Sequence, residues 1–313
     1  MIPAAFDYTR PASVDEAVAA LADEDAKVLA GGQSLIPLLR LRLAAPTLVV
    51  DLGGLAELRG IRDGGDALVV GAMTTHASVL ADPLVDRYAP LLAQATATVA
   101  DRQVRHRGTL GGALAHADPA GDLPAVAVAL DATLEIAGPA GRRTVAAADF
   151  FVDYLTTVLE PGEVLVAVHI PKREGWSTHY EKFSRVAQGW ALVGVAAMVR
   201  RADGRIAEAR VALTNMATTP VRAAAVEAAL TGCAVDPAAV RAAAAHAAEG
   251  TGPTGDLSAS AEYRSHLARV LTGRAVLAAL GGPDDGAVGA APAGGRPPGG
   301  VDNGTASGRA DAA

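Results

Sequence analysis

The sequence predicts an α+β fold that is divided among two or three lobes, and three observations lead to this expectation. A chain of 313 residues exceeds the usual size of one domain and can bury a large core. Half of the residues are apolar but only 4% are aromatic, so Val, Leu, Ile and Ala must supply the core volume. Short apolar runs of strand length occur between segments whose apolar residues recur at helical spacing, which indicates a mixture of strands and helices.

The first lobe is expected to occupy about 55 residues. It begins with a helix, because Ser13–Glu16 has the form of a capping box and Val14, Val18 and Leu21 follow at helical spacing. A short strand, a helix and a buried strand are then expected at Lys27–Ala30, Ser34–Leu43 and Thr47–Leu52.

The mixed pattern continues through the rest of the chain. In the second lobe, strands are expected at Ala67–Gly71, Thr133–Ala137 and Gly162–Pro171, and helices at Thr75–Leu80 and Pro90–Ala100. Pro171 and Gly175 mark a lobe boundary. The third lobe is expected to hold strands at Ser177–Ser184, Ala191–Arg200 and Ala207–Leu213, and alanine-rich helices at Val221–Leu230, Pro237–Glu249 and Tyr263–Leu280. Residues 282–313 include almost no core-forming side chains, so we expect a disordered tail rich in Gly, Pro and Ala.

The composition excludes several classes of function. The net charge is −7 with acidic and basic residues interspersed, which gives no electrostatic basis for nucleic-acid binding. No apolar run approaches the ~20 residues of a membrane span. The first residues do not show the basic segment and following apolar stretch of a secretory signal, so we expect a cytoplasmic protein. The single cysteine, Cys233, can form no internal disulfide and cannot hold an iron–sulfur cluster by itself.

The first of two glycine-paired turns follows the first predicted strand. We define the first turn by its six residues, which are Ala30, Gly31, Gly32, Gln33, Ser34 and Leu35. The amides from Gly32 to Leu35 are expected to point outward at a helix start, where the helix dipole favours negative charge. Glycine lets N–H groups approach phosphate oxygens closely, so the turn suits a dinucleotide pyrophosphate. The alternative is an ordinary strand–turn–helix connection in which Ser34 only caps the helix.

The second turn lies about 80 residues further along the chain. It comprises Gly108, Thr109, Leu110, Gly111, Gly112 and Ala113, and it offers a hydroxyl and several unhindered amides. Asp122, about ten residues later, could reach a ribose hydroxyl as acidic residues do in other dinucleotide folds. Asp122 could instead be the N-cap of a helix that begins at Leu123. His106 and His116 belong to no metal-ligand pattern, so we expect them to have structural roles.

Motifs for other kinds of catalysis are missing from the sequence. There is no G-x-G-x-x-G for a nicotinamide nucleotide, no G-x-x-x-x-G-K-[ST] for a nucleoside triphosphate and no G-x-S-x-G for a serine nucleophile. The sequence also lacks a Cys/His pair of the kind that enzymes use for covalent catalysis. The absence of these motifs favours a redox function in which a bound cofactor performs the chemistry. We therefore expect neither a catalytic side chain nor a metal ligand.

Five segments of the sequence together resemble the FAD-binding medium subunit of molybdenum hydroxylases. They are AGGQSLIPLLRLRLAAPTLVVDLGGLAELRGI, VGAMTTHASVL, QVRHRGTLGGALAHADPAGDLPAV, EVLVAVHIP and YEKFSR. The likeness is closest to the aerobic carbon monoxide dehydrogenase type and more distant to xanthine dehydrogenase FAD-binding subunits. It implies a vanillyl-alcohol-oxidase (PCMH) type FAD-binding domain at residues 1–173, with subdomains at about 1–55 and 56–173, and a smaller α+β C-terminal domain at 174–281.

The resemblance also implies which residues would touch the cofactor. Ala30–Ser34 and the residues that follow, as far as Pro37, would wrap the FAD pyrophosphate, and Thr109, Leu110, Gly111 and Gly112 would form a second contact with the cofactor. Asp122 would contact the ribitol or ribose region, while Leu165 and Lys182 would flank the flavin or the adenine. Without the resemblance, the pattern predicts a core leucine at Leu165 and a solvated lysine at Lys182.

Two positions depart from the family pattern. Ala113 stands where the family often has Asn, Asp or Ser, so only its backbone could serve the cofactor. Gln33 stands where some members have His, which changes a polar contact but not the turn.

The function implied by the resemblance is that of an oxidoreductase subunit with non-covalent FAD, since no His or Cys near the first turn could bond to the flavin. Molybdopterin would be held by a large partner subunit and [2Fe–2S] clusters by a small one, and the three chains would form a dimer of heterotrimers. Electrons would pass from the clusters through FAD to an external acceptor. Two alternatives remain open, namely a free-standing FAD-dependent oxidase or dehydrogenase and an assembly protein that binds no flavin. The sequence leaves open whether the substrate is carbon monoxide, a purine, an aldehyde or an N-heterocycle.

Overall fold

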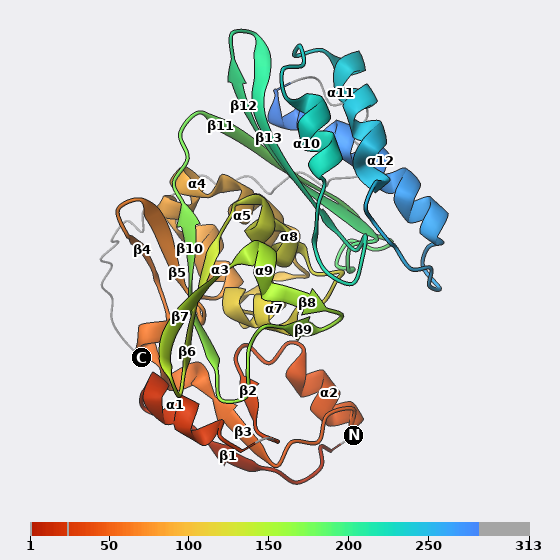
Figure 1. Cartoon of the computed structure of the whole chain (residues 1–313). Coiled ribbons are helices and arrows are strands. Elements are labelled where there is room, and N and C mark those ends of the chain that lie inside the picture. Colours follow the sequence, from red (N-terminus) through yellow and green to blue (C-terminus); the bar gives the residue numbers. More distant parts are fainter. Residues whose placement is uncertain (1, 24, 282–313) are drawn as a thin grey trace, which may run out of the picture. The chain divides into compact units, whose positions relative to one another are not determined.

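The computed structural model describes residues 2–23 and 25–281 (Figure 1). The tail that we expect at residues 282–313 lies outside these residues. Three separate sheets and one short hairpin, each accompanied by helices, make up the described chain and confirm the α+β class.

The first sheet is small and parallel, with strand order β1-β3-β2. Its strands are β1 (Asp7–Thr9), β2 (Lys27–Leu29) and β3 (Leu48–Asp51), and its helices are α1 (Val14–Ala20) and α2 (Leu35–Leu41). The Ser13 hydroxyl accepts a hydrogen bond from the Glu16 amide at 3.1 Å, as the capping box predicts. The Glu16 carboxylate accepts from the Ala12 amide, one residue earlier than an ideal box requires.

The second sheet is antiparallel, with order β4-β5-β10-β6-β7. Its strands are β4 (Ile61–Asp63), β5 (Ala67–Gly71), β6 (Thr133–Gly138), β7 (Gly141–Ala146) and the central β10 (Val164–Pro171). The helices of this part are α3 (His76–Ala81), α4 (Pro83–Tyr88), α5 (Pro90–Ala97), α6 (Arg102–Arg105), α7 (Leu110–His116), α8 (Asp122–Ala129) and α9 (Ala147–Phe150), and a hairpin joins β8 (Phe151–Asp153) to β9 (Thr156–Thr157). All eight residues of α8 are buried, so this helix lies in the centre of the core.

The third sheet is antiparallel, with order β11-β12-β13-β14. It comprises β11 (Trp176–Phe183), β12 (Val193–Ala202), β13 (Arg205–Thr214) and β14 (Val221–Arg222), and the helices α10 (Ala224–Leu230), α11 (Pro237–Ala244) and α12 (Ala261–Ala279) accompany it (Figure 1). In β12, Ala196 and Met198 belong to the core that contains α5 and α8, whereas Val195 and Ala197 belong to the core beside α10–α12. Burial on both faces explains the unbroken apolar run from Val193 to Val199 in this strand.

An ion-pair cluster links the loop after α8 to the third sheet. Asp131 Oδ1 accepts a hydrogen bond from Arg222 at 2.9 Å, and Oδ2 accepts from Arg173 at 2.7 Å and from Arg210. The guanidinium carbons of Arg173 and Arg210 lie 5.9 and 5.4 Å from the centroid of the Trp176 ring. We call these five residues the Asp131 cluster.

Several expected elements differ from the observed ones. The helix expected at Val221–Leu230 begins only at Ala224, because Val221 and Arg222 instead pair with β13 as an edge strand. The sequence patterns missed β1, β4, β7, α4, α6, α9 and the β8–β9 hairpin, which are short or mostly polar. The lobe boundaries stay predictions.

Candidate functional site

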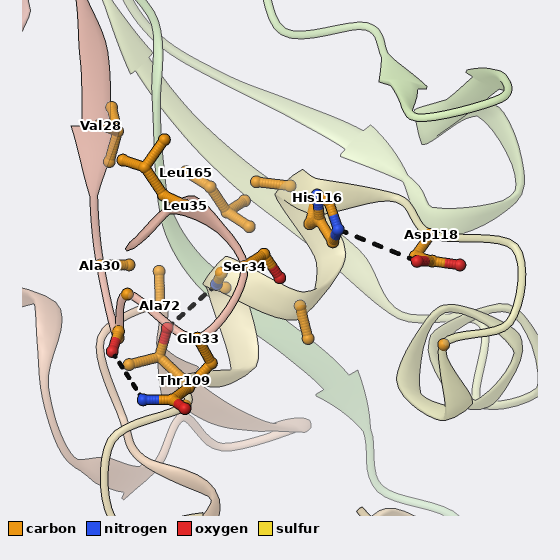
Figure 2. A pocket seen from close by; sticks show the side chains of 18 of the residues that line it. Val28, Ala30, Gln33, Ser34, Leu35, Ala72, Thr109, His116, Asp118 and Leu165 are labelled. Carbon is orange, nitrogen blue, oxygen red and sulfur yellow. Dashed lines mark hydrogen bonds and ion pairs between the residues drawn. The ribbon is translucent and has the colours of Figure 1, made fainter. Parts of the chain in front are cut away.

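A cavity of about 740 Å³ lies where the first turn, the second turn, α8, β10 and β11 meet. Thirteen of the site residues expected from the sequence line it; they are Ala30, Gly31, Gly32, Gln33, Ser34, Leu35, Thr109, Gly111, Gly112, Ala113, Asp122, Leu165 and Lys182. Figure 2 shows part of this lining from close by. Leu110 does not line the cavity, because its side chain is buried in the core.

The first turn presents a row of open backbone donors. Within the described chain, the amides from Gly31 to Leu35 donate no hydrogen bond. Ser34 occupies the N-cap position of α2, but its hydroxyl makes no capping bond, so the interpretation of Ser34 as a simple cap is wrong. The Gln33 side chain folds back and donates to the Gly31 carbonyl at 3.3 Å (Figure 2). The open amides are thus left for a ligand in the cavity.

The second turn differs from the expectation, because the amides from Leu110 to Ala113 already have partners. Leu110 and Gly111 donate to the carbonyls of Thr74 and Ala72, at 3.0 and 2.8 Å. Gly112 and Ala113 donate to the side chain and the carbonyl of Thr109, which is the N-cap of α7. The second turn therefore offers the cavity a closely packed wall and not a row of free donors.

Glycine in both turns permits close backbone packing. A Cβ at Gly31 would lie 2.1 Å from the Arg107 carbonyl oxygen and 2.8 Å from the Gly108 Cα. A Cβ at Gly111 would lie 2.7 Å from the Ala72 carbonyl oxygen. The first turn consequently rests directly on the segment that begins the second turn, and the two form one wall of the cavity.

A buried ion pair lies at another side of the cavity. Asp122 is the first residue of α8 and not its N-cap, which is Gly121. Its Oδ2 accepts a hydrogen bond from Lys182 Nζ at 2.7 Å, and its Oδ1 accepts from the Tyr180 hydroxyl at 2.6 Å. The side chains of Lys182 and Asp122 are only 8% and 4% exposed, so Lys182 is not the solvated lysine that the pattern alone predicts.

Sequence reasoning missed two groups that line the cavity. Trp190 is 60% exposed and belongs to the loop between β11 and β12, together with Gln188 and Gly189. An aromatic residue in a loop gives no periodic signal, so only the fold could identify it. His116, for which we expect a structural role from the sequence, also lines the cavity, and its Nε2 lies 3.9 Å from a carboxylate oxygen of Asp118 (Figure 2).

The second missed group is His76, which is 4% exposed. Within the described chain, its Nδ1 has no hydrogen-bond partner. Burial lowers the pKa of His76 to about 4, and the nearby Arg105 charge contributes to the same shift. The imidazole is therefore neutral at pH 7.

The pKa of His76 predicts a loss of stability in acid. Between pH 6.5 and about 4 the unfolded chain binds a proton at His76 that the folded chain does not bind, so stability falls as the pH falls through this window. Across this window, the protonation of His76 lowers the free energy of unfolding by up to roughly 3 kcal/mol. We expect His76→Gln to flatten this part of the curve of unfolding free energy against pH, measured by urea denaturation. An unchanged slope in the variant would assign the acid sensitivity to other groups.

In residues 2–23 and 25–281, no three His, Cys, Asp or Glu side chains are grouped so as to hold a metal ion. No helix of the same residues is both long enough and apolar enough to cross a membrane.

Comparison with known proteins gives matches along both halves of the chain. The family model for the FAD binding domain in molybdopterin dehydrogenase matches residues 4–173, and that for the CO dehydrogenase flavoprotein C-terminal domain matches residues 178–279. The carbon monoxide dehydrogenase medium chain of Hydrogenophaga pseudoflava is 44% identical over 211 residues, covering 66% of this chain and 73% of that protein. The nicotine 6-hydroxylase medium subunit of Paenarthrobacter nicotinovorans is 42% identical over 204 residues, covering 64% and 71%.

Solved structures show the same likeness. Carbon monoxide dehydrogenase from Hydrogenophaga pseudoflava, in a form that lacks the Mo-pyranopterin moiety, matches with a TM-score of 0.88 over 90% of this chain and 99% of that one, at 44% identity. Quinoline 2-oxidoreductase from Pseudomonas putida 86 matches with a TM-score of 0.86 over 90% and 99%, at 41% identity. These relatives are named for different substrates, so the likeness does not single out one substrate for this chain.

Proposed function

This chain belongs to the family of FAD-binding medium subunits of molybdenum hydroxylases, and from that premise we propose that it binds one FAD non-covalently and passes electrons from iron–sulfur clusters of a partner subunit to an external acceptor. The family members are subunits of oxidoreductases that contain several chains. The single observation that carries the proposal is the row of open amides from Gly31 to Leu35 at the edge of a large cavity.

The residues of the cavity fit FAD in both size and chemistry. A volume of about 740 Å³ lies within the range of cofactor and ligand sites. Free backbone N–H groups are the donors that a pyrophosphate requires. Val28, Leu35 and Leu165 supply apolar surface against which aromatic rings can pack.

Each part of the site then has a distinct role. The first turn would hold the pyrophosphate through its amides, and the second turn, from Thr109 to Ala113, would support the first turn and shape the wall. Lys182 would bring a positive charge to the cofactor, with Asp122 as its counter-ion. Asp122 also lines the cavity, so it stays the predicted contact of the ribitol or ribose region. Leu165 would pack against the flavin or the adenine. When bound, FAD supplies reversible electron uptake and release, which these residues orient but do not perform.

Partner chains are part of the same proposal. We expect a small subunit with iron–sulfur clusters and a large subunit with the molybdenum cofactor, assembled as a dimer of heterotrimers. The one cysteine of this chain is too few to ligate a [2Fe–2S] cluster, so substrate electrons need another chain to reach FAD.

The first test is the flavin content of the purified chain. We expect one FAD per chain, released into the supernatant by acid precipitation, because no His or Cys of the first turn can bond to the flavin. Flavin that stays with the protein pellet would contradict non-covalent binding.

The second test is reconstitution. The chain alone should reduce a dye with an artificial donor but hydroxylate no substrate, and hydroxylation should appear only after both partner subunits are added. Substrate-dependent turnover by the metal-free chain would instead favour a free-standing flavin oxidase.

A further inference from the structure

Tyr180 makes a hydrogen bond that the proposed function does not use. Its side chain is buried, it does not line the cavity, and its hydroxyl lies 2.6 Å from Asp122 Oδ1. Tyr180 and Lys182 are two residues apart on β11, so both side chains point to the same face of the sheet. Asp122 therefore receives one hydrogen bond from a residue inside the cavity and one from a residue behind it.

The neighbouring strand leaves space for the phenol group. Gly194 of β12 pairs with Lys182, and a Cβ at Gly194 would lie 2.4 Å from the Tyr180 hydroxyl oxygen and 3.1 Å from the Thr214 Cβ. The phenol ring is stiff and enclosed, so it could not move aside without losing its contact with Asp122. Glycine is therefore required at position 194 because a larger residue would occupy the space of the Tyr180 hydroxyl.

The charges explain why Asp122 needs two donors. Burial raises the pKa of the Asp122 carboxyl, while the charge and the hydrogen bond of Lys182 and the hydrogen bond of Tyr180 act in the opposite direction. Burial and the adjacent Asp122 raise the pKa of Tyr180 well above its usual value, so the phenol stays protonated and acts as a donor. An Asp122 that took up a proton would release the ammonium group of Lys182, leaving it held only by the Thr98 carbonyl at 3.3 Å.

We propose that Tyr180 is a positioning residue of the FAD site, whose hydroxyl, in the space left by Gly194, fixes the Asp122 carboxylate so that it holds Lys182 in the cavity. The inference rests on the proposed function, because holding Lys182 in one position affects function only if Lys182 contacts FAD. Tyr180 itself touches no part of the cavity and acts only through Asp122.

The test measures FAD affinity of the full chain from pH 8 to pH 6 in the wild type, Tyr180→Phe and Tyr154→Phe. Tyr154 is the matched control, since it is 61% exposed and lies in the β8–β9 hairpin. We expect Tyr180→Phe to weaken binding about 10-fold at pH 8, equivalent to about 1.4 kcal/mol, and further as the pH falls. Tyr154→Phe should follow the wild-type profile, so any pH dependence from other cavity groups, such as His116 beside Asp118, cancels in the comparison and leaves the part that is due to Tyr180.

Two further variants show whether the effect passes through Asp122. In an Asp122→Asn background the added Tyr180→Phe change should cause no further loss of affinity and no pH dependence. Gly194→Ala should lower both the melting temperature and the affinity. Adding Tyr180→Phe to it should recover part of the melting temperature but none of the affinity, because the clash with the hydroxyl is relieved while the close approach to Thr214 remains and the hydrogen bond to Asp122 stays absent.

The outcomes separate this inference from the proposed function. If the wild type binds FAD and Tyr180→Phe matches it in affinity and pH profile, even with a lower melting temperature, Tyr180 is only structural and the inference is overturned. If the wild type binds no FAD at any pH, the proposed function fails first and the inference falls with it.

Discussion

Gly31→Ala is expected to strip the protein of FAD. The added Cβ would lie 2.1 Å from the Arg107 carbonyl oxygen and 2.8 Å from the Gly108 Cα, and both are backbone atoms that cannot rotate away. The first turn would have to move off the second, which would tilt the amides from Gly31 to Leu35 away from the pyrophosphate. We expect FAD affinity to fall at least 100-fold, or about 2.7 kcal/mol, measured by flavin titration.

Gly252→Ala is the matched control for this change. No atom would lie within 4 Å of a Cβ at Gly252, and its φ is not in the left-handed region. This variant should keep full flavin content. Far-ultraviolet circular dichroism should show that Gly31→Ala still folds, so that the loss is one of binding. A Gly31→Ala protein with wild-type affinity would show that the first turn does not hold the pyrophosphate.

Asp131→Ala is expected to cause a large loss of stability for a change at a partly exposed position. Removing this carboxylate leaves Arg173, Arg210 and Arg222 facing one another without the anion that they share. We expect a loss of about 2 kcal/mol in unfolding free energy, below the ~3–5 kcal/mol of a fully buried pair, because the Asp131 side chain is 35% exposed.

Asp203→Ala controls for the backbone at this position. Asp131 and Asp203 both have positive φ, 48° and 51°, so alanine meets the same left-handed strain at each. Asp203 is exposed in the turn between β12 and β13. The comparison uses urea denaturation of the FAD-bound protein. Equal losses in the two variants would show that the Asp131 cluster adds nothing beyond turn geometry.

The sequence patterns correctly predicted those helices and strands that are determined by residues close to one another in the chain. The capping box at Ser13, the strand that ends at the first turn and the continuous apolar run of β12 all depend on residues a few positions apart. Short elements such as β1 were missed, because three residues, of which two are exposed and one is half-buried, carry no periodic signal.

The candidate site was only partly predictable, for a physical reason. The amides of Leu110 and Gly111 are bonded to Thr74 and Ala72, which lie more than 30 residues earlier, so the loss of these two donors could not be deduced from the turn itself. Asp122 likewise finds its partners 58 and 60 residues away on β11. Nothing beside Asp122 in the sequence indicates that its carboxylate is already engaged.

The positions of the two tryptophans give the protein a pair of built-in optical reporters. Trp190 lines the cavity, so its fluorescence should be quenched by energy transfer when a yellow cofactor enters. Trp176 lies against Arg173 and Arg210 in the Asp131 cluster, so its emission should shift to longer wavelength when the cluster separates and water reaches the ring. With Trp176→Phe or Trp190→Phe, one unlabelled sample can therefore follow either cofactor entry or loosening of the contact between α8 and the third sheet.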